Sequence, residues 1–383
     1  MNPRIWLSPP HMGGNELKYI EEAFASNWIA PLGPNVDGFE QQLRAITQTE
    51  AAVALNSGTG ALHLALRVLG VQPGDVVLCQ SMTFAASAFP IVYEKAEPVF
   101  IDSEETTWNM DPALLEEALA HYKKQGRRVA AIIPVHLYGM PAQMDRILQL
   151  AAEYEVPVIE DAAEALGSRY QDRPCGSLGT VGILSFNGNK IITTSGGGAM
   201  VSMHAQLVEQ VRFLSTQARE PQPHYEHKEV GFNYRMSNVT AGIGRGQLDV
   251  LADRVARRRA IHDYYQEQLQ QLAGIRFLAE PANSFSNRWL TTIVVDPAAS
   301  GGVSREAIRL RLDEHNIESR PLWKPMHQQP VFDECRAFCN GNSDLLFQNG
   351  LCLPSGSAMT NTDLDRVCSL VAQCWHEATT QTT

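Results

Sequence analysis

A lysine suited to covalent chemistry stands in residues 185–198, which read SFNGNKIITTSGGG. A lysine that attacks a carbonyl carbon must be uncharged at that moment, and small polar neighbours favour this state more than acidic ones do. Lys190 has such neighbours along the chain in Asn187, Asn189 and Ser195. A single lysine is more often a solvated surface charge, so the prediction of a nucleophile needs further residues in support.

A carboxylate that could serve the same reaction follows the apolar run 156–159. Asp161 ends this strand-like run in VPVIEDAAEALGS, where it could be buried against an aromatic ring. Pyridoxal phosphate is the cofactor that combines a protein lysine with a carboxylate, because the carboxylate pairs with the pyridinium nitrogen and keeps the ring an electron sink. The alternative reading of a strand-end aspartate is a helix cap.

A site for the cofactor phosphate is indicated by SGTGAL at residues 57–62. This segment follows the apolar run 51–55 and opens a stretch with leucines at helical spacing. Backbone N–H groups and the hydroxyls of Ser57 and Thr59 would gather at a helix N-terminus, where anions bind. The lysine, the carboxylate and the anion site together predict a pyridoxal phosphate protein.

The motifs extend over residues 7–356. EDAA and the lysine segment resemble the DegT/DnrJ/EryC1/StrS family of sugar-nucleotide aminotransferases, a branch of the fold-type I pyridoxal phosphate enzymes. Within that family, NGNKIITTSGGG, STQARE and RPLWKPMH are most similar to the UDP-N-acetylbacillosamine transaminases. The other matching segments are LSPPHMGGNELKYIEEAF, SNWIAPLGP, SGTGALHLALR, HYEH, NYRMSN, SNRWL and LCLPSG.

The pattern of elements and the resemblance both predict an α/β fold. Strand-like runs alternate with helical patterns between about residues 51 and 201, which is typical of a parallel sheet covered by helices. These runs are 76–79, 98–101, 129–133, 156–159 and 182–186. The resemblance implies the fold type I of aminotransferases: a large domain, residues 1–245, with an N-terminal arm and a mostly parallel seven-stranded-type sheet, and a smaller C-terminal α/β domain, residues 246–383, with a long connecting helix.

Local signals predict several further elements. A first helix is expected over residues 15–25, an extended and turn-rich segment over 31–38, and a helix that begins at Asp111-Pro112. The apolar positions between residues 248 and 272 predict the long connecting helix, with the arginines 257–259 on a solvated face. A strand at 291–296 and a capped helix from Ser304 indicate a smaller α/β unit.

The resemblance also implies which residues bind the cofactor. Phe84 and Ala163 would lie on the two faces of the ring, and Glu164 would lie near its phenolic oxygen, where relatives often carry Gln or His. Asn233 would reach the cofactor phosphate of the neighbouring subunit. The full predicted set is Gly58, Thr59, Phe84, Asp161, Ala163, Glu164, Ser185, Asn187, Lys190 and Asn233, with Lys190 and Asp161 catalytic.

A substrate loop is predicted in SRPLWKPMH, which offers two cations, an aromatic plane and a titratable group. This set suits a nucleotide diphosphate, because Arg and Lys meet phosphate charge and an aromatic ring stacks on a base. The prolines would stiffen the loop. The predicted substrate residues are Arg320, Trp323, Lys324 and His327, with Asn27, Trp28 and Arg235 as weaker candidates.

The resemblance implies a reaction as well. The substrate would be UDP-2-acetamido-4-keto-2,6-dideoxy-D-glucose, the product its 4-amino sugar nucleotide and the amino donor L-glutamate, in bacillosamine-type sugar biosynthesis for bacterial glycans or glycoproteins. The active sites would be shared in a homodimer. Alternatives are GDP-4-keto-6-deoxymannose, a dTDP-linked keto sugar, or a regulator that binds the cofactor without turnover. Relatives that dehydrate carry histidine in place of the lysine, whereas Lys190 is present here.

Composition excludes several other classes of protein. The 383 residues are 44% hydrophobic, which is enough for a large core. A formal charge of −11 argues against nucleic-acid binding, and no apolar run is long enough for a membrane span, so we expect a cytoplasmic protein. The seven cysteines are scattered without a C-x-x-C, so neither a metal site nor a disulfide framework is expected.

Overall fold

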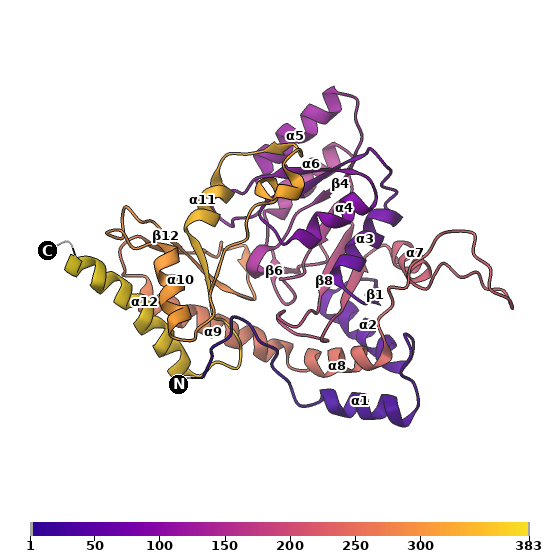
Figure 1. Ribbon diagram of the computed structural model, residues 1–383. Coiled ribbons are helices and arrows are strands. Elements are labelled where there is room, and N and C mark those ends of the chain that lie inside the picture. Colours follow the sequence, from indigo (N-terminus) through magenta and orange to yellow (C-terminus); the bar gives the residue numbers. More distant parts are fainter. Residues whose placement is uncertain (1–2, 382–383) are drawn as a thin grey trace.

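The computed structural model describes residues 3–381, with side chains described as far as residue 378. Figure 1 shows a large central sheet covered by helices and a smaller sheet beside it, next to α9, α10 and α12. The N-terminal segment passes close to α9 and α12 before it reaches α1 (Glu16–Ala25). None of the helices in the described residues is long and apolar enough to cross a membrane.

The central sheet has two four-stranded parts, with the orders β1–β9–β8–β5 and β14–β3–β2–β4. Parallel bridges from Ile132 to Val158 and from Val135 to Asp161 join β4 to β5. Only β9 runs antiparallel to its neighbours in these two parts. The predicted mostly parallel sheet is therefore confirmed. The strands are β1 Ala51–Leu55, β2 Val76–Gln80, β3 Glu97–Ile101, β4 Val129–Ile133, β5 Ile159–Asp161, β8 Val181–Ser185, β9 Gly198–Ser202 and β14 Ala337–Phe338.

Helices cover both faces of the central sheet. Alternate residues of a strand face opposite sides: Ala52 and Ala54 of β1 pack in the cluster that contains α2, whereas Val53 and Leu55 pack with α3 and α7. The helices α5 and α6 cover the β2–β3–β4 part. Burial on both faces explains why these strands read as continuous apolar runs. The helices are α2 Pro34–Thr47, α3 Gly58–Val68, α4 Phe89–Tyr93, α5 Pro112–Lys124, α6 Met144–Glu153 and α7 Ala205–Ser215, with short 3₁₀ turns at Ala85–Ser87 and Leu137–Gly139.

The second sheet is antiparallel and has the order β10–β12–β15–β13. It packs with α9, α10 and α12 in a separate hydrophobic cluster. This separate core supports the boundary predicted at residue 245, which stays a prediction. The elements are α8 Asn238–Leu248, α9 Leu251–Leu269, β10 Ile275–Phe277, β12 Thr291–Val295, α10 Arg305–Glu314, β13 Arg320–Pro321, α11 Asn342–Asn349, β15 Gly350–Leu353 and α12 Asn361–Gln381, with 3₁₀ turns at Met326–Gln328 and Pro330–Phe332.

A three-stranded sheet, β11–β6–β7, links the two parts of the chain. Its strands are β6 Arg169–Tyr170, β7 Arg173–Pro174 and β11 Ser284–Phe285. The pairing of Ser284 with Tyr170 brings the segment before Trp289 against the segment that follows Asp161.

Three expectations from the sequence need correction. Residues 31–38 are not all extended, because α2 begins at Pro34, where the missing N–H of proline costs a helix nothing. The expected long helix is preceded by a separate helix, α8, and α9 begins at Leu251. The arginine run does not lie on a solvated face, because Arg258 is 1% exposed. The predicted helix starts at Asp111 and Ser304 are confirmed, since both side chains cap their helices.

Candidate active site

A cavity of about 300 Å³ lies at the carboxyl ends of β1, β5 and β8. Parallel strands present their carboxyl ends at one edge of a sheet, where α/β proteins bind ligands. The cavity walls include nine of the ten predicted cofactor-binding residues and one predicted substrate residue: Gly58, Thr59, Phe84, Asp161, Ala163, Glu164, Ser185, Asn187, Lys190 and Trp323. The fold therefore brings together residues that are far apart in the sequence.

The amine of Lys190 lies between a carboxylate and an aromatic face. Its Nζ is 3.4 Å from Oε1 of Glu164 and 4.4 Å from the ring centroid of Trp289. The lysine side chain is 10% exposed. The small polar neighbours of Lys190 along the chain are therefore joined by an acidic one, Glu164, which comes from the segment after β5 and not from the lysine segment itself.

Glu164 is buried and held at two points. Its Oε2 accepts the N–H of Tyr138 at 2.7 Å, and its Oε1 faces Lys190. Burial raises the pKa of Glu164 above its ordinary value, although Lys190 and the Tyr138 N–H oppose this shift. A carboxyl group with a raised pKa beside a lysine can share a proton with it.

Asp161 also lines the cavity, and two hydrogen bonds hold its carboxylate. It is 6% exposed, its Oδ2 accepts the hydroxyl of Ser87 at 2.7 Å, and its Oδ1 accepts the N–H of Ala163 at 3.1 Å. Ser87 in turn lies 2.7 Å from the hydroxyl of Thr83. These bonds leave the carboxylate directed at the cavity that it lines, where it can pair with a protonated ring nitrogen.

An anion cradle forms at the start of α3. Ser57 caps this helix, with its Oγ accepting the N–H of Gly60 at 3.0 Å. The N–H groups of the first helical turn, Gly58 and Thr59, have no acceptor within the helix and border the cavity. A Cβ on Gly58 would lie 3.1 Å from Cβ of Ser185, so a larger residue would crowd the hydroxyl on the facing strand. The cradle suits a phosphate.

Two aromatic side chains border the mouth of the cavity. Phe84 is 54% exposed, and its ring centroid is 5.5 Å from that of Trp323. Trp323 also stacks on Tyr138 with 6.4 Å between centroids and an interplanar angle of 13°. Ala163 adds a small side chain to the wall. A flat ring in the cavity would therefore have the aromatic side chain of Phe84 at the mouth and the small side chain of Ala163 within.

A second hollow of about 390 Å³ adjoins this cavity and shares Asn189, Trp289 and Trp323 with it. Arg320 and Trp6 also line this hollow. Arg320 carries an ion pair to Glu318 at 2.6 Å and keeps 63% of its side chain exposed. The adjoining hollow thus combines a solvated cation with indole rings.

Other predicted substrate residues lie elsewhere. The ring of His327 contacts Ser81 at 2.6 Å and Asp344 at 2.9 Å and lines neither the cavity nor the adjoining hollow, so its role in substrate binding stays a prediction. Lys324 lines neither the cavity nor the adjoining hollow. The guanidinium of Arg235 is buried and pairs with Glu40 at 2.8 Å, and its role in substrate binding also stays a prediction.

Three predicted residues stand on the surface and are not among the residues that line the cavity. Asn27 and Trp28 follow α1 with exposed side chains, and the Trp28 carbonyl accepts the Nδ2–H of Asn238 at 2.8 Å. Asn233 is exposed, and its carbonyl accepts the Nδ2–H of Asn56 at 3.3 Å. These three side chains do not complete the cavity of their own chain.

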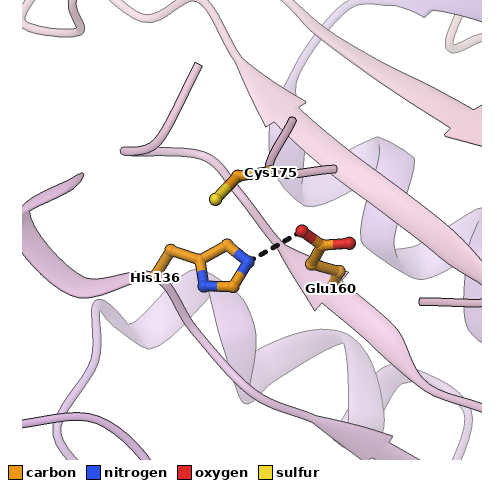
Figure 2. Close-up of side chains that lie close together, drawn as sticks. All are labelled: His136, Glu160 and Cys175. Atoms are coloured by element: carbon orange, nitrogen blue, oxygen red, sulfur yellow. Dashed lines mark hydrogen bonds and ion pairs between the residues drawn. The ribbon is translucent and has the colours of Figure 1, made fainter. Parts of the chain in front are cut away.

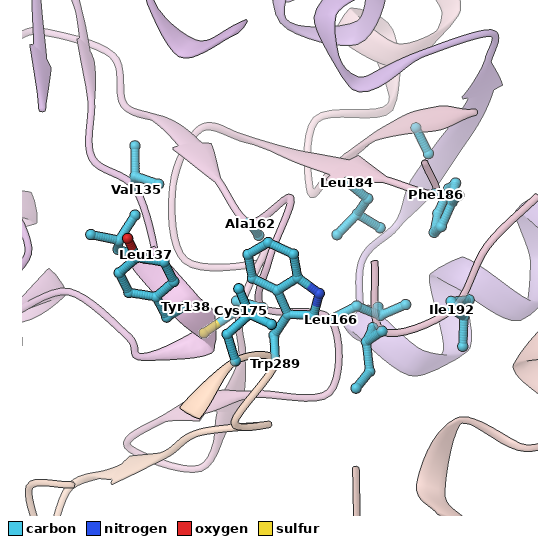
Figure 3. Packing of buried hydrophobic residues seen from close by; sticks show 14 of the residues in the cluster. Val135, Leu137, Tyr138, Ala162, Leu166, Cys175, Leu184, Phe186, Ile192 and Trp289 are labelled. Carbon is cyan, nitrogen blue, oxygen red and sulfur yellow. The ribbon is translucent and has the colours of Figure 1, made fainter. Parts of the chain in front are cut away.

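Trp289 is a residue of the site that residue-by-residue reasoning missed. Figure 3 shows its indole packed among Tyr138, Ala162 and Leu166 in the core beneath the cavity. Its Nε1–H donates to the carbonyl of Asn189 at 2.8 Å. The motif SNRWL carried part of the resemblance, but nothing in its local pattern indicated contact with Lys190.

A second polar cluster lies fully buried behind Asp161. His136, Glu160 and Cys175 have ligand atoms within 4.8 Å of one another, as a metal site would require (Figure 2). Hydrogen bonds already use the nitrogens and the carboxylate: Nδ1 of His136 accepts the N–H of Ala142 at 3.0 Å, and Nε2 lies 2.7 Å from Glu160. The arrangement is that of a neutral histidine donating to a carboxylate, which braces the strand end before Asp161.

Comparisons with known proteins place this geometry in a family. Residues 10–372 match the model of the DegT/DnrJ/EryC1/StrS aminotransferase family. The chain belongs to that family. It is 53% identical over 380 residues to the "Putative pyridoxal phosphate-dependent aminotransferase EpsN" of Bacillus subtilis. This match covers 98% of this chain and 97% of the relative. It is 37% identical to the GDP-perosamine synthase of Caulobacter vibrioides, over 97% of this chain and 98% of the relative.

A solved structure agrees with these relatives. The PLP-form of the putative sugar aminotransferase Spr1654 from Streptococcus pneumoniae superimposes with a TM-score of 0.89, at 27% identity, and covers 98% of this chain and 99% of that one. The protein is a pyridoxal phosphate-dependent sugar-nucleotide aminotransferase. The predicted family, fold class, enzyme class and cofactor are confirmed.

The residues present fit this cofactor. The cavity offers a helix N-terminus with hydroxyls for the phosphate, a carboxylate that accepts hydrogen bonds from Ser87 and Ala163, and a lysine amine. Each wall supplies the donor or acceptor that the corresponding part of the ring requires.

Proposed function

We propose that this aminotransferase converts UDP-2-acetamido-4-keto-2,6-dideoxy-D-glucose to the 4-amino sugar nucleotide, with L-glutamate as amino donor, in bacillosamine-type sugar biosynthesis. The observation that carries the proposal is the cavity that joins Lys190, Asp161 and the α3 anion cradle, next to a hollow that contains Arg320 and Trp6. A sugar nucleotide needs both compartments, because its sugar must reach the lysine while its diphosphate and base remain outside.

The residues of this chain divide the work of the reaction. When bound, pyridoxal phosphate supplies an electron sink for the charge that develops when a proton leaves carbon. Lys190 would hold the cofactor and, once freed by an amino donor, would move the proton. Asp161 would keep the proton on the ring nitrogen. Ser185 and the N–H groups of Gly58 and Thr59 would bind the phosphate.

Glu164 would assist Lys190. Its Oε1 is the acidic atom near Nζ, at 3.4 Å, and burial raises its pKa. The carboxyl group can accept the proton that Lys190 must lose before it attacks. It can also hydrogen bond to a phenolic oxygen when it is itself protonated.

The nucleotide would lie in the adjoining hollow. Arg320 there keeps N–H groups free for phosphate oxygens beyond its ion pair with Glu318. Trp6 is 54% exposed, with the guanidinium of Arg4 at 4.9 Å from its ring, so a base could stack in the same region. A variant without the Arg320 charge should raise KM for the sugar nucleotide more than KM for glutamate.

The working enzyme would be a homodimer with shared active sites. Asn27, Trp28 and Asn233 lie outside the cavity of their own chain, and α1 leaves Leu17 and Phe24 largely exposed. Exposed large apolar side chains in such numbers are typical of a surface that another protein covers. A neighbouring subunit seated there would bring these residues to the second cavity.

A GDP-linked substrate is the second candidate. The 37% identity to a GDP-perosamine synthase over 97% of this chain favours GDP-4-keto-6-deoxymannose. The sequence of the loop around Arg320, RPLWKPMH, favours the UDP-N-acetyl sugar instead. dTDP-linked keto sugars follow, and a regulator without turnover is the least favoured, since such a protein has no need of the second hollow.

A single-turnover assay tests the proposal. The protein with its cofactor in the aminated form is mixed with UDP-2-acetamido-4-keto-2,6-dideoxyglucose, and cofactor absorbance and product mass are followed. We expect fast return of the aldehyde-form absorbance and a 4-amino sugar nucleotide. Reaction with the GDP-linked sugar alone would overturn the UDP proposal, and no reaction with any keto sugar nucleotide would favour the regulator.

A further inference from the structure

A buried arginine is linked to the catalytic lysine segment through two side chains. Arg258 of α9 donates from Nη2 to the hydroxyl of Ser8 at 2.9 Å and from Nη1 to the carbonyl of Trp289. Ser8 and Trp289 both donate to the carbonyl of Asn189, at 2.7 and 2.8 Å. Asn189 immediately precedes Lys190 in the chain.

The direction of every bond in this network is determined by chemistry. A guanidinium only donates, so the Ser8 oxygen must accept from Arg258 and must use its own hydrogen elsewhere. The carbonyl of Asn189 can only accept. Arg258 therefore turns the Ser8 hydroxyl toward Asn189, and it holds the backbone of the residue whose indole is the second donor.

Arg258 is a buried cation without an anionic partner in the part of the chain that the structure describes. It is 1% exposed, and no carboxylate in residues 3–378 lies within ion-pair distance of it. Its Nε–H has no hydrogen-bond partner among the described side chains and backbone. Burial, together with the charge of Arg254, lowers its pKa to about 9. An unpaired buried cation costs stability, so its retention calls for a role other than stabilising the fold.

The network also spans the two parts of the chain. Val255, one turn before Arg258, packs in the core beneath the cavity, while Ile261 packs in the core of the smaller sheet. Arg258 thus stands on α9 where the two cores meet, and its partners come from the N-terminal segment and from the loop before β12.

We propose that Arg258 is a positioning residue for Lys190. It acts through Ser8 and Trp289, which hold the Asn189 carbonyl from two sides and keep the Trp289 ring 4.4 Å from Nζ. The lysine amine is thereby held toward the cavity before any cofactor binds. The inference rests on Lys190 being the cofactor-bearing lysine, as proposed above.

The test measures how fast the cofactor-free protein bonds pyridoxal phosphate to its lysine, by stopped-flow absorbance. Arg258→Met should slow this step roughly 10- to 100-fold, because misplacement by about 1 Å costs rates of that order. Turnover of the loaded enzyme should fall in kcat with little change in KM for the sugar nucleotide. Arg258→Lys, which keeps one charged donor, should recover part of the loss.

Matched variants separate positioning from folding. Arg257→Met removes the neighbouring arginine, which donates to the carbonyl of Met359 instead, and should leave the capture rate unchanged. Ser8→Ala keeps the Arg258 guanidinium but removes both its acceptor and one donor to the Asn189 carbonyl, and it should slow capture as well. In the Arg258→Met background Ser8→Ala should have little further effect, because the two residues act in one chain of bonds.

Each outcome has a distinct meaning. If Arg258→Met and Ser8→Ala capture the cofactor at the wild-type rate while unfolding more readily, the role is structural and the inference is wrong. If the effects of Ser8→Ala and Arg258→Met are independent, Arg258 does not act through Ser8, and the proposed route is wrong. If the wild-type protein captures no pyridoxal phosphate at Lys190, the failure belongs to the assignment of Lys190 instead.

Discussion

Replacement of Glu160 by Gln should destabilise the protein strongly, because four donors converge on this carboxylate. Oε1 faces Nε2 of His136 at 2.7 Å and accepts the N–H of Gly176, while Oε2 accepts the N–H groups of Leu178 and Gly179 at 2.8 and 3.0 Å. The carboxylate is fully buried. No water can therefore replace a lost acceptor.

The magnitude follows from counting acceptors. Glutamine has one acceptor oxygen, so its amide NH₂ must face either the His136 side or the pair of backbone N–H groups. At least two donors then lose their acceptor, and at about 1–3 kcal/mol for each buried unsatisfied group the loss is roughly 2–6 kcal/mol. That is a large share of a typical stability of about 5–15 kcal/mol.

Urea unfolding of the two proteins measures this difference. Glu97→Gln is the matched control, because Glu97 pairs with Arg127 on the surface, where both side chains are over a third exposed. An exposed pair contributes about 0–1 kcal/mol. A loss for Glu160→Gln no larger than that of the control would refute the account of the cluster.

The pH dependence gives a second check. Burial alone would raise the pKa of Glu160, but the bonds from His136 and the backbone N–H groups outweigh it and lower the pKa. Because the pKa is lowered in the folded protein, the ionised carboxylate stabilises the fold at pH values above the ordinary glutamate pKa. That contribution is lost as pH falls toward the lowered pKa. The difference in the free energy of unfolding between wild type and Glu160→Gln should therefore become smaller at acidic pH. A gap that widens there would contradict the assignment.

Three further predictions concern the cavity. Lys190→Ala should abolish turnover, and borohydride reduction followed by mass spectrometry should find no cofactor bonded to the chain; a fully active variant would end the mechanism. Asp161→Asn should lower kcat about 10²- to 10⁴-fold, as expected for loss of a group that controls a proton, with steady-state kinetics as the measure and Asp145→Asn as an unconnected control. In the cofactor-free protein, burial raises the pKa of Glu164 above its value in the unfolded chain. The protonated carboxyl therefore stabilises the fold at low pH, and this contribution is lost as pH rises through the raised pKa. Urea unfolding should show Glu164→Gln gaining on wild type with increasing pH, and a constant difference would contradict this.

Local patterns predicted the elements that carry the site. The strand-like runs matched β1, β2, β3, β4 and β8, because strands buried on both faces must be apolar throughout. SGTGAL predicted a helix start, and α3 begins at Gly58 with Ser57 as its cap. The antiparallel β9 was not predicted, since strand direction depends on pairing and leaves no mark on the strand's own residues.

Errors arose where a residue's surroundings come from distant segments. The arginine run looked like a solvated face, yet Arg258 is bonded to Ser8, 250 positions away. A charged residue type predicts exposure only on average, and the fold can bury it when partners from elsewhere are at hand.

The sequence by itself determined the chemistry that is encoded locally: the lysine among small polar residues, the carboxylate at a strand end and the hydroxyl-capped helix start. These signals are local because each depends on a residue type and its immediate neighbours. Only the tertiary structure decided that Glu164 and Trp289 flank the amine of Lys190 and that a buried arginine supports its segment. Those contacts join strands, a helix and a loop from both parts of the chain, and they exist only once packing has brought these segments together.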